Sequence, residues 1–348
     1  MGRIQNIQAL RGIAVLSVVF FHLLMIERKY GGSKTILPDF FQFGMFGVDL
    51  FFVISGFVMF TVSRGKFQIP KQALRFIYHR VARIYPTYWF YSILVLVVFL
   101  LQPSWVNNSQ GNQVNILSSF LLLPSHTLPL VMVGWTLIHE MYFYLMFFFI
   151  FLLIPERHLT YAILLWGIGV VLLNLNSESS SPVISIISHP LTLEFLGGCI
   201  LASIYYKKEF KINSSILLML AGLGLLTAIC GYLAYNRATG QIAPLGWWRI
   251  VIFGIPALLM VYCLTNAERN GFVIHSSLIY IGDASYSLYL SHGLTLSAIG
   301  RVWSIFPSDD VLDNIIMMPF LIIPVLFVGF MSYRMVEMPL LKLSRRIA

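Results

Sequence analysis

Two ionisable residues stand in the first apolar segment of the chain, and their types and spacing suggest a reactive site. Arg11 and His22 are eleven residues apart, which is about three helical turns, so a helix would place both on one face. Their separation along the helix axis would be about 16 Å. Ionisable groups are costly at membrane depth and usually face a protein interior or an aqueous cavity. We therefore predict that this helix lines a site.

His22 suits general-base catalysis, because an imidazole titrates near neutral pH. The alternative at this position is a histidine that bonds to a neighbouring helix and has no chemical role. Arg11 also has a structural alternative, since an arginine near the end of a span can extend its head group to the membrane interface.

Two acidic residues in later apolar segments could assist His22. Asp49 lies early in the second segment, and Glu140 lies about nine residues into the fourth. Counting along the helices at ~1.5 Å per residue places Glu140 and His22 at nearly the same depth. A carboxylate beside an imidazole can fix its tautomer and stabilise the imidazolium that forms on proton uptake. A structural pair of Glu140 with an arginine or a backbone group is the alternative.

The composition indicates an integral membrane protein. Hydrophobic residues make up 58% of the 348 residues and charged residues only 11%, which excludes an ordinary soluble domain. We expect one all-α domain over residues 1–348, a polytopic bundle of about ten transmembrane helices. The first segment is long and lacks a small-residue cleavage pattern, so we expect an uncleaved span. The expected spans are 7–26, 43–63, 84–101, 131–154, 159–175, 183–206, 214–234, 246–265, 285–305 and 315–338.

The distribution of the net charge of +9 predicts the topology. With the N-terminus in the cytoplasm, most basic residues fall in cytoplasmic segments, as the positive-inside rule requires. Both termini are then cytoplasmic, and the charge needs no nucleic-acid partner. The cytoplasmic basic residues would be Arg64, Lys66, Lys71, Arg75, Arg80, Arg83, Arg157, Lys207, Lys208, Lys211, Arg269, Lys342, Arg345 and Arg346. The opposite loops would hold Arg28, Lys29, Lys34 and Arg237.

Two stretches between the spans have features of their own. Residues 69–85 read as an amphipathic cytoplasmic helix that Pro70 opens, with Arg80 and Arg83 on its basic face. Anionic membrane lipids are one partner for such a face. The 102–130 loop turns apolar at 116–123, which fits a short interfacial or re-entrant helix. The chain shows no nucleophile elbow, phosphate loop or zinc-ligand spacing, so we expect no metal.

Six motifs occur in a characteristic order, and together they resemble the acyltransferase 3 family of integral membrane acyltransferases. The resemblance runs from residue 4 to about residue 343 and is greatest to stand-alone bacterial exopolysaccharide O-acetyltransferases of the succinoglycan type. The motifs are Arg11 with His22, Gly47 to Phe57, Arg80 to Pro86, Trp135 to Tyr144, Ser285 to His292, and Glu337 to Pro339.

The resemblance implies a ten-helix enzyme of the bacterial inner membrane. It would take an acyl group, by default acetyl, from cytoplasmic acyl-CoA and deliver it to a polysaccharide or lipid-linked glycan outside. The family's arginine and histidine of the first span correspond to Arg11 and His22, its paired arginines to Arg80 and Arg83, and its tryptophan-to-glutamate motif to Trp135 and Glu140. Arg11, Arg80 and Arg83 would bind the donor, whose phosphates suit guanidinium groups. His22, Glu140 and Asp49 are the candidate catalytic residues.

Several alternatives stay open from the sequence. An acetyl-histidine intermediate competes with direct transfer to the acceptor hydroxyl. The acceptor could instead be a membrane lipid, a peptide or an antibiotic. A polytopic transporter that uses His22, Asp49 and Glu140 as a proton relay is the rival from another class. Many relatives carry a fused extracytoplasmic esterase-like domain, which this chain lacks. We therefore expect either that transfer finishes at the membrane or that a separate extracytoplasmic partner acts.

Overall fold

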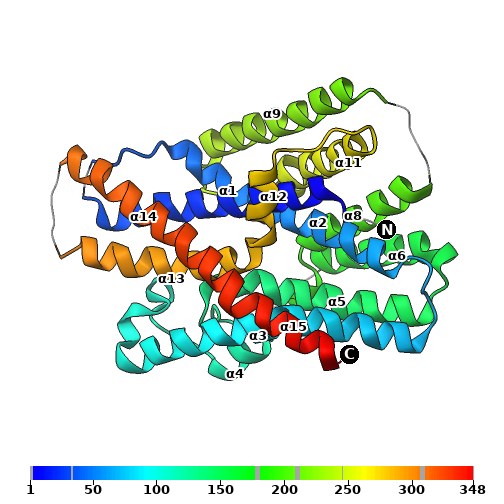
Figure 1. Ribbon diagram of the computed structural model, residues 1–348, viewed down its shortest axis with the longest axis horizontal. Helices are drawn as coiled ribbons and strands as arrows, with labels where there is room; N and C mark the ends of the chain where they lie inside the picture. The colour runs from blue at the N-terminus through cyan, green and yellow to red at the C-terminus, as the bar shows by residue number, and fades with distance from the viewer. Residues whose placement is uncertain are drawn as a thin grey trace. The chain divides into compact units, whose positions relative to one another are not determined.

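The computed structural model of the protein is helical throughout the part of the chain that it describes (Figure 1). It describes residues 3–32, 34–176, 181–207, 212–244, 246–305 and 310–347, and no strand occurs in these ranges. The all-α prediction is confirmed. Lys208 and Lys211, on which the charge argument drew, lie outside the described residues, as do the side chains of Arg345 and Arg346.

Nine helices in the described residues are long and apolar enough to cross a membrane. The remaining predicted span, 285–305, is also a helix, α13 (Ser285–Trp303), but it is not among these nine. Polar residues of α13 lower its hydropathy, and they include Ser287, Ser291 and His292. All three are buried inside the protein and so do not face lipid. The polytopic all-α bundle is therefore confirmed, whereas the cytoplasmic position of the termini stays a prediction.

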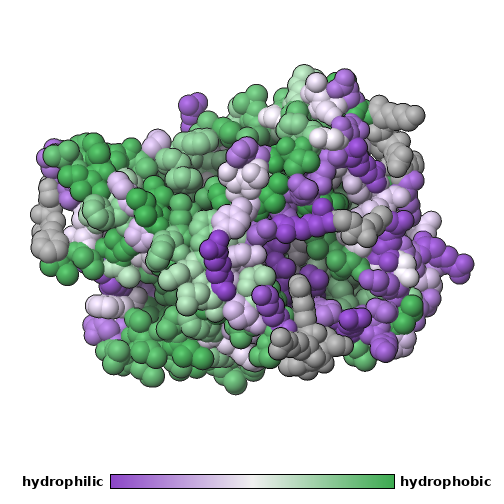
Figure 2. Space-filling view, viewed as in Figure 1, coloured by the Kyte–Doolittle hydropathy of each residue, from purple (hydrophilic) through white to green (hydrophobic). Residues whose placement is uncertain are grey.

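Exposed apolar side chains show where lipid would contact the protein. Helix α14 (Val311–Ser332) exposes large hydrophobic residues along its length, among them Ile316, Phe320, Ile323 and Phe327. Figure 2 shows apolar side chains covering the surface over α14, on the left of the view. A contiguous apolar stripe of this kind is unfavourable in water and favourable against lipid.

The described chain forms two compact units that alternate along the sequence. Unit 1 comprises residues 1–14, 45–77 and 139–283, and unit 2 comprises residues 15–44, 78–138 and 284–348. Helices α1 (Gln5–Tyr30), α3 (Pro70–Leu101) and α5 (Trp135–Leu153) contribute residues to both units. The single catalytic domain expected from the sequence stays a prediction.

Three parallel helices form the centre of unit 1. They are α2 (Phe46–Ser63), α8 (Leu191–Lys207) and α11 (Ile255–Arg269), the last preceded by the short α10 (Trp247–Arg249) and a π-helical turn. Contacts along their lengths establish the parallel direction: Glu194 lies against Gly254 near the first ends, and Tyr205 contacts Arg269 at the last ends. The other helices of unit 1 are α6 (Leu159–Asn176), α7 (Pro182–Ile187), α9 (Ser214–Thr239) and α12 (Ser276–Asp283).

Glycines allow α2 and α8 to approach closely. A Cβ added to Gly56 would lie 1.9 Å from the carbonyl oxygen of Phe195, and one added to Gly198 would lie 2.1 Å from that of Val53. Such distances are sterically impossible, so only glycine fits at these two positions. Small residues commonly bring transmembrane helices together in this way. The contact fixes α2, which carries Asp49, against α8.

The start of α1 is anchored within unit 1. The Glu268 carboxylate accepts hydrogen bonds from the backbone N–H groups of Gln5 and Asn6, at 2.8 and 2.7 Å. These N–H groups have no partner inside the helix, and a carboxylate also complements the positive end of the helix dipole. The Asn6 side chain donates to the carbonyl oxygens of Leu264 and Phe272, both at 2.9 Å. Arg11 therefore stands on a helix whose first turn is fixed.

Helix α3 differs from the sequence expectation. The amphipathic stretch 69–85 and the span 84–101 form one continuous helix, Pro70–Leu101, which contains Pro86. The sequence shows two segments because the residue pattern changes from amphipathic to apolar, but nothing between them interrupts the helix. In the 102–130 loop the expected short helix is present as α4 (Ile116–Leu121).

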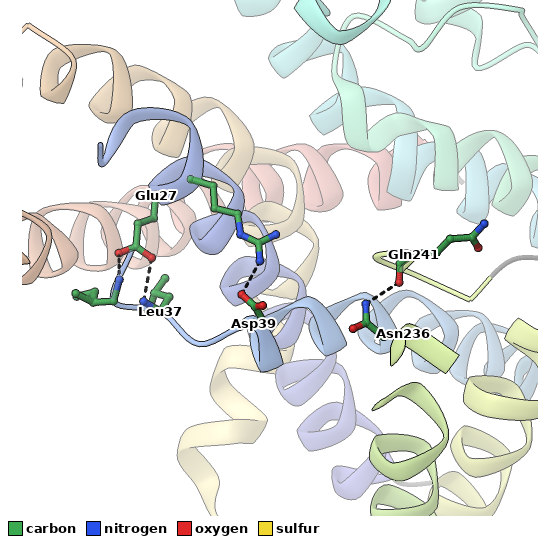
Figure 3. Close-up of polar contacts among 7 residues, drawn as sticks. Glu27, Leu37, Asp39, Asn236 and Gln241 are labelled. Carbon is green, nitrogen blue, oxygen red and sulfur yellow. Dashed lines mark hydrogen bonds and ion pairs between the residues drawn. The ribbon is translucent and has the colours of Figure 1, made fainter. Parts of the chain in front are cut away.

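Unit 2 is built around α13, α14 and the later part of α1. Val19 and Leu23 of α1 pack with Leu296 of α13 and Leu321 of α14 in one apolar core. The Glu27 carboxylate at the end of α1 ties down the following loop, accepting from the backbone N–H groups of Ile36 and Leu37 at 2.7 and 3.0 Å (Figure 3). These contacts hold the segment of α1 that carries His22. The short α15 (Met338–Ile347) ends the chain.

Candidate active site

His22 and His292 form a pair inside unit 2. Their rings lie 4.7 Å apart at 67°, and His292 Nε2 is 3.2 Å from His22 Nδ1. Helix α1 positions His22 and α13 positions His292. His292 is completely buried, whereas His22 keeps part of its surface accessible. The pair therefore presents one buried ring and one partly open ring.

The surrounding acceptors determine which nitrogen of each ring carries hydrogen. His292 Nδ1 lies 3.1 Å from the Leu288 carbonyl oxygen. A carbonyl can only accept, so Nδ1 of His292 carries the hydrogen and its Nε2 has a lone pair. His22 Nδ1 lies 2.9 Å from the Val18 carbonyl oxygen and faces that lone pair at 3.2 Å.

Both groups around His22 Nδ1 are therefore acceptors, and this nitrogen must carry the hydrogen. The neutral ring then keeps its lone pair on Nε2. Within the described ranges, no residue forms a hydrogen bond with that nitrogen. The Val18 carbonyl group and the His292 ring thus leave His22 able to accept a proton at Nε2.

A tyrosine connects the histidine pair to the tryptophan-to-glutamate motif. The Tyr289 ring lies 5.8 Å from that of His292. Its hydroxyl is 2.8 Å from Thr136 Oγ1, so the residue after Trp135 contacts α13. The segment from Ser285 to His292 is one of the six motifs of the sequence, but His292 was not among the predicted site residues. The one sequence signal for His292 is that, like His22, it is a histidine within a predicted span.

Glu140 lies in unit 1, where its carboxylate has two hydroxyl neighbours. It accepts a hydrogen bond from Ser55 Oγ at 3.3 Å and another from the Tyr144 hydroxyl. The expected pairing of Glu140 with His22 would join residues of different units and stays a prediction. The hydrogen bonds of His22 in the structure are made to His292 and Val18.

Asp49 forms a buried ion pair with Arg249. The guanidinium donates from Nε to Oδ1 at 2.7 Å and from its Nη2 to Oδ2 at 2.8 Å. Both side chains are buried, and this two-pronged geometry is the strongest that an arginine and a carboxylate can form. Arg249 was not among the predicted site residues, because it stands near the start of an apolar segment, where a basic residue commonly flanks a span. The pair occupies both oxygens of Asp49.

Further ionisable groups surround this ion pair in unit 1. The buried Glu194 carboxyl lies so close to Gly254 that an added Cβ there would be 3.0 Å from Oε1. The rings of His139 and His189 lie 4.7 Å apart. These groups stand at the starts of α5, α8 and α10–α11, near the first turn of α2.

The three arginines expected to bind a donor are found on long helices. Arg11 is partly buried in the first half of α1 and belongs to unit 1. Arg80 and Arg83 are also partly buried, one turn apart on α3 in unit 2. Residues three apart lie on the same side of a helix, so Arg80 and Arg83 share one side of α3. Their role toward a donor stays a prediction.

Comparison with known proteins gives a consistent result. Residues 4–334 match the family described as an acyltransferase domain. The chain is 27% identical to the exopolysaccharide production protein ExoZ of Rhizobium meliloti (strain 1021), over 88% of this chain and 92% of that protein.

Two further relatives are more distant. A "Putative acetyltransferase" of Acidianus two-tailed virus is 25% identical over 85% of the chain and 84% of that protein. A "Putative O-acetyltransferase" of Staphylococcus aureus (strain COL) is 25% identical over 86% of the chain but only 52% of that protein. No solved structure matches the chain significantly.

Proposed function

The chain belongs to the acyltransferase family that covers residues 4–334, and from that premise we propose a specific reaction. The protein is a membrane-embedded O-acetyltransferase that moves an acetyl group from cytoplasmic acetyl-CoA to a hydroxyl of an extracytoplasmic or lipid-linked polysaccharide. It acts in the bacterial inner membrane. The exopolysaccharide named in one relative supports the acceptor class, and the positive-inside charge pattern supports a donor side in the cytoplasm.

The observation that carries this proposal is the open Nε2 of His22. As the acceptor oxygen attacks the thioester carbonyl, its proton passes to Nε2 and the new C–O bond forms. The C–S bond then breaks, and the leaving thiolate takes up the proton that His22 holds. The reaction consumes no net proton. The Val18 carbonyl oxygen and the buried His292 together favour the tautomer that leaves the lone pair on Nε2.

The remaining candidate residues take roles that their chemistry supports. Arg11, Arg80 and Arg83 are the candidate donor-binding residues, because guanidinium groups suit the phosphate groups of the donor. Glu140 remains the candidate catalytic carboxylate predicted from the sequence. A separate extracytoplasmic protein could receive or present the glycan, and an acetyl-histidine intermediate is the competing route through the same nitrogen.

The test uses sealed proteoliposomes. Labelled acetyl-CoA is supplied on the side of the cytoplasmic face of the protein, and candidate glycan is supplied on the other side. His22→Ala should lower transfer of label to the glycan by about a hundredfold or more, the contribution expected of a general base. Folded yield should stay near normal. His126→Ala, which removes an exposed loop histidine, is the matched control.

Two results would contradict the proposal. Full transfer by His22→Ala would remove the proposed base. Movement of acyl or glycan material across the membrane without loss of acetyl from CoA would favour the transporter alternative. Charge reversal of Arg80 and Arg83 to Glu should mainly weaken acetyl-CoA binding, and unchanged affinity would return that helix to a lipid-binding role.

A further inference from the structure

The last ends of the three parallel helices of unit 1 bring two arginines onto two tyrosines. The Arg269 guanidinium carbon lies 3.5 Å from the centre of the Tyr205 ring, and that of Arg64 lies 4.6 Å from the Tyr206 ring. The two rings are themselves 5.0 Å apart at 86°. We call these four residues the arginine–tyrosine cluster. It joins the ends of α2, α8 and α11.

The cluster holds its two positive charges in fixed positions. Stacking on an aromatic face stabilises a guanidinium and leaves its N–H edge free to donate. Both arginines are exposed, whereas Tyr205 is buried and serves as a rigid platform. Among the residues that the structure describes, neither guanidinium forms an ion pair with a carboxylate. The neighbouring Glu268 carboxylate is occupied by the backbone of α1.

The surroundings of the cluster are also basic and open. Lys66 and Lys207 are exposed next to it in sequence, and Figure 2 shows hydrophilic side chains gathered on the right of the view, where α8 ends. The topology predicted from the charge pattern puts the last ends of α2, α8 and α11 at the cytoplasmic surface. The ion pair of Asp49 and Arg249 stands at the opposite ends of these helices.

We propose that the arginine–tyrosine cluster binds phosphoryl groups of the acyl donor, a nucleotide-linked thioester. This inference rests on the proposed function, because it takes the acyl donor of that reaction as the ligand of the cluster. Planar guanidinium groups match phosphate oxygens in a forked geometry, and stacking fixes the two forks before the ligand arrives. Anionic lipid headgroups present the same phosphate chemistry, so the experiment has to separate the two sources.

The test measures acetyl-CoA affinity by titration calorimetry with purified full-length protein in a neutral detergent, without lipid. Arg64→Gln and Arg269→Gln should each raise the dissociation constant by about tenfold, the usual loss for one charge-assisted hydrogen bond. Arg64→Lys should give an intermediate value, because it keeps the charge but loses the fork. Arg237→Gln, which removes an exposed arginine at the end of α9, is the matched control.

Each alternative predicts a different outcome. Unchanged affinity in both glutamine variants, with acetyl-CoA still bound by the wild type, would overturn this inference and leave the proposed function intact. A wild type that binds no acetyl-CoA would overturn the proposed function itself. If the two glutamine substitutions weakened binding only in vesicles that contain anionic lipid, and not in neutral detergent, lipid headgroups would be the ligand. That result would contradict donor binding.

A purely structural role also has a distinct signature. Arginines at helix C-termini stabilise the helix dipole, so such a role would lower the melting temperature of the variants without changing affinity. That result would overturn the inference. Equal melting temperatures with weakened donor binding would support it.

Discussion

The histidine pair of unit 2 and the ion pair of unit 1 are both made of two ionisable side chains held between helices. In the ion pair, Arg249 donates a hydrogen bond to each of the two oxygens of Asp49. In the histidine pair, His292 engages only one nitrogen of His22. From this difference we predict that the ion pair is structural and that the histidine pair is the reactive one. An ionisable residue in an apolar segment marks a functional site when part of its hydrogen-bonding capacity stays open.

The largest effect is expected from breaking the ion pair. Arg249→Met should lower the free energy of unfolding by about 3–5 kcal/mol, because it leaves the Asp49 carboxylate buried without a partner. The loss of stability would be measured by heating the protein in detergent and monitoring how much of the monodisperse peak remains in size-exclusion chromatography. Adding Asp49→Leu should restore most of the loss, since no charge then stays buried. If Arg249→Met were as stable as wild type, the pair would not be a structural element.

The next effect concerns the reaction and not stability. His292→Phe removes one of the two acceptors at Nδ1 of His22 and leaves only the Val18 carbonyl oxygen to orient the ring. We expect kcat to fall roughly ten- to a hundredfold, as is typical when a reactive ring loses an orienting partner, with little change in KM for acetyl-CoA. His292→Gln places an amide oxygen at that position and should recover much of the rate.

The kcat and KM values of these two variants separate positioning from packing. A packing role would make phenylalanine the milder substitution, because it fills the space of the ring, and glutamine the worse one. That order of activities would contradict the tautomer argument. Equal melting temperatures for both variants would show that the comparison concerns chemistry.

A smaller effect tests the close contact that holds α2 against α8. Gly198→Ala would bring a Cβ to 2.1 Å from the Val53 carbonyl oxygen, so the helices would have to separate. We expect a loss of about 1–3 kcal/mol in unfolding free energy, the usual cost of overpacking. Gly222→Ala on α9 is the control, since nothing lies within 4 Å of its added Cβ. Equal melting temperatures of the two variants would mean that the close packing of α2 against α8 is not required for stability.

The sequence predicted the elements better than their partners. Apolar segment lengths located the helices because a bilayer fixes the length of a span. Arg11 and His22 could be recognised because they interrupt an apolar run. Arg249 looked like a residue that flanks a span, and only the parallel packing of α2 and α11 makes it the partner of Asp49.

His292 was missed for a related reason. A helical pattern shows which residues share a face, but it does not show which faces of two distant helices meet. The contact between His22 and His292 joins residues 270 positions apart, and no periodicity within α1 or α13 encodes it. The expected depth match of His22 and Glu140 rested on counting alone and remains to be tested.

The smallest effect comes from an exposed version of the same ion-pair chemistry. Arg28 Nη2 lies 2.6 Å from Asp39 Oδ1 (Figure 3), with side-chain exposures of 32% and 83%. The corresponding values for Arg249 and Asp49 are 10% and 0%. Water and salt screen an exposed pair, so Arg28→Gln should lower unfolding free energy by no more than about 1 kcal/mol. The melting temperature of Arg28→Gln could instead fall as far as that of Arg249→Met. Burial would then not explain why the ion pair of unit 1 is structural, and the comparison of that ion pair with the histidine pair would fail.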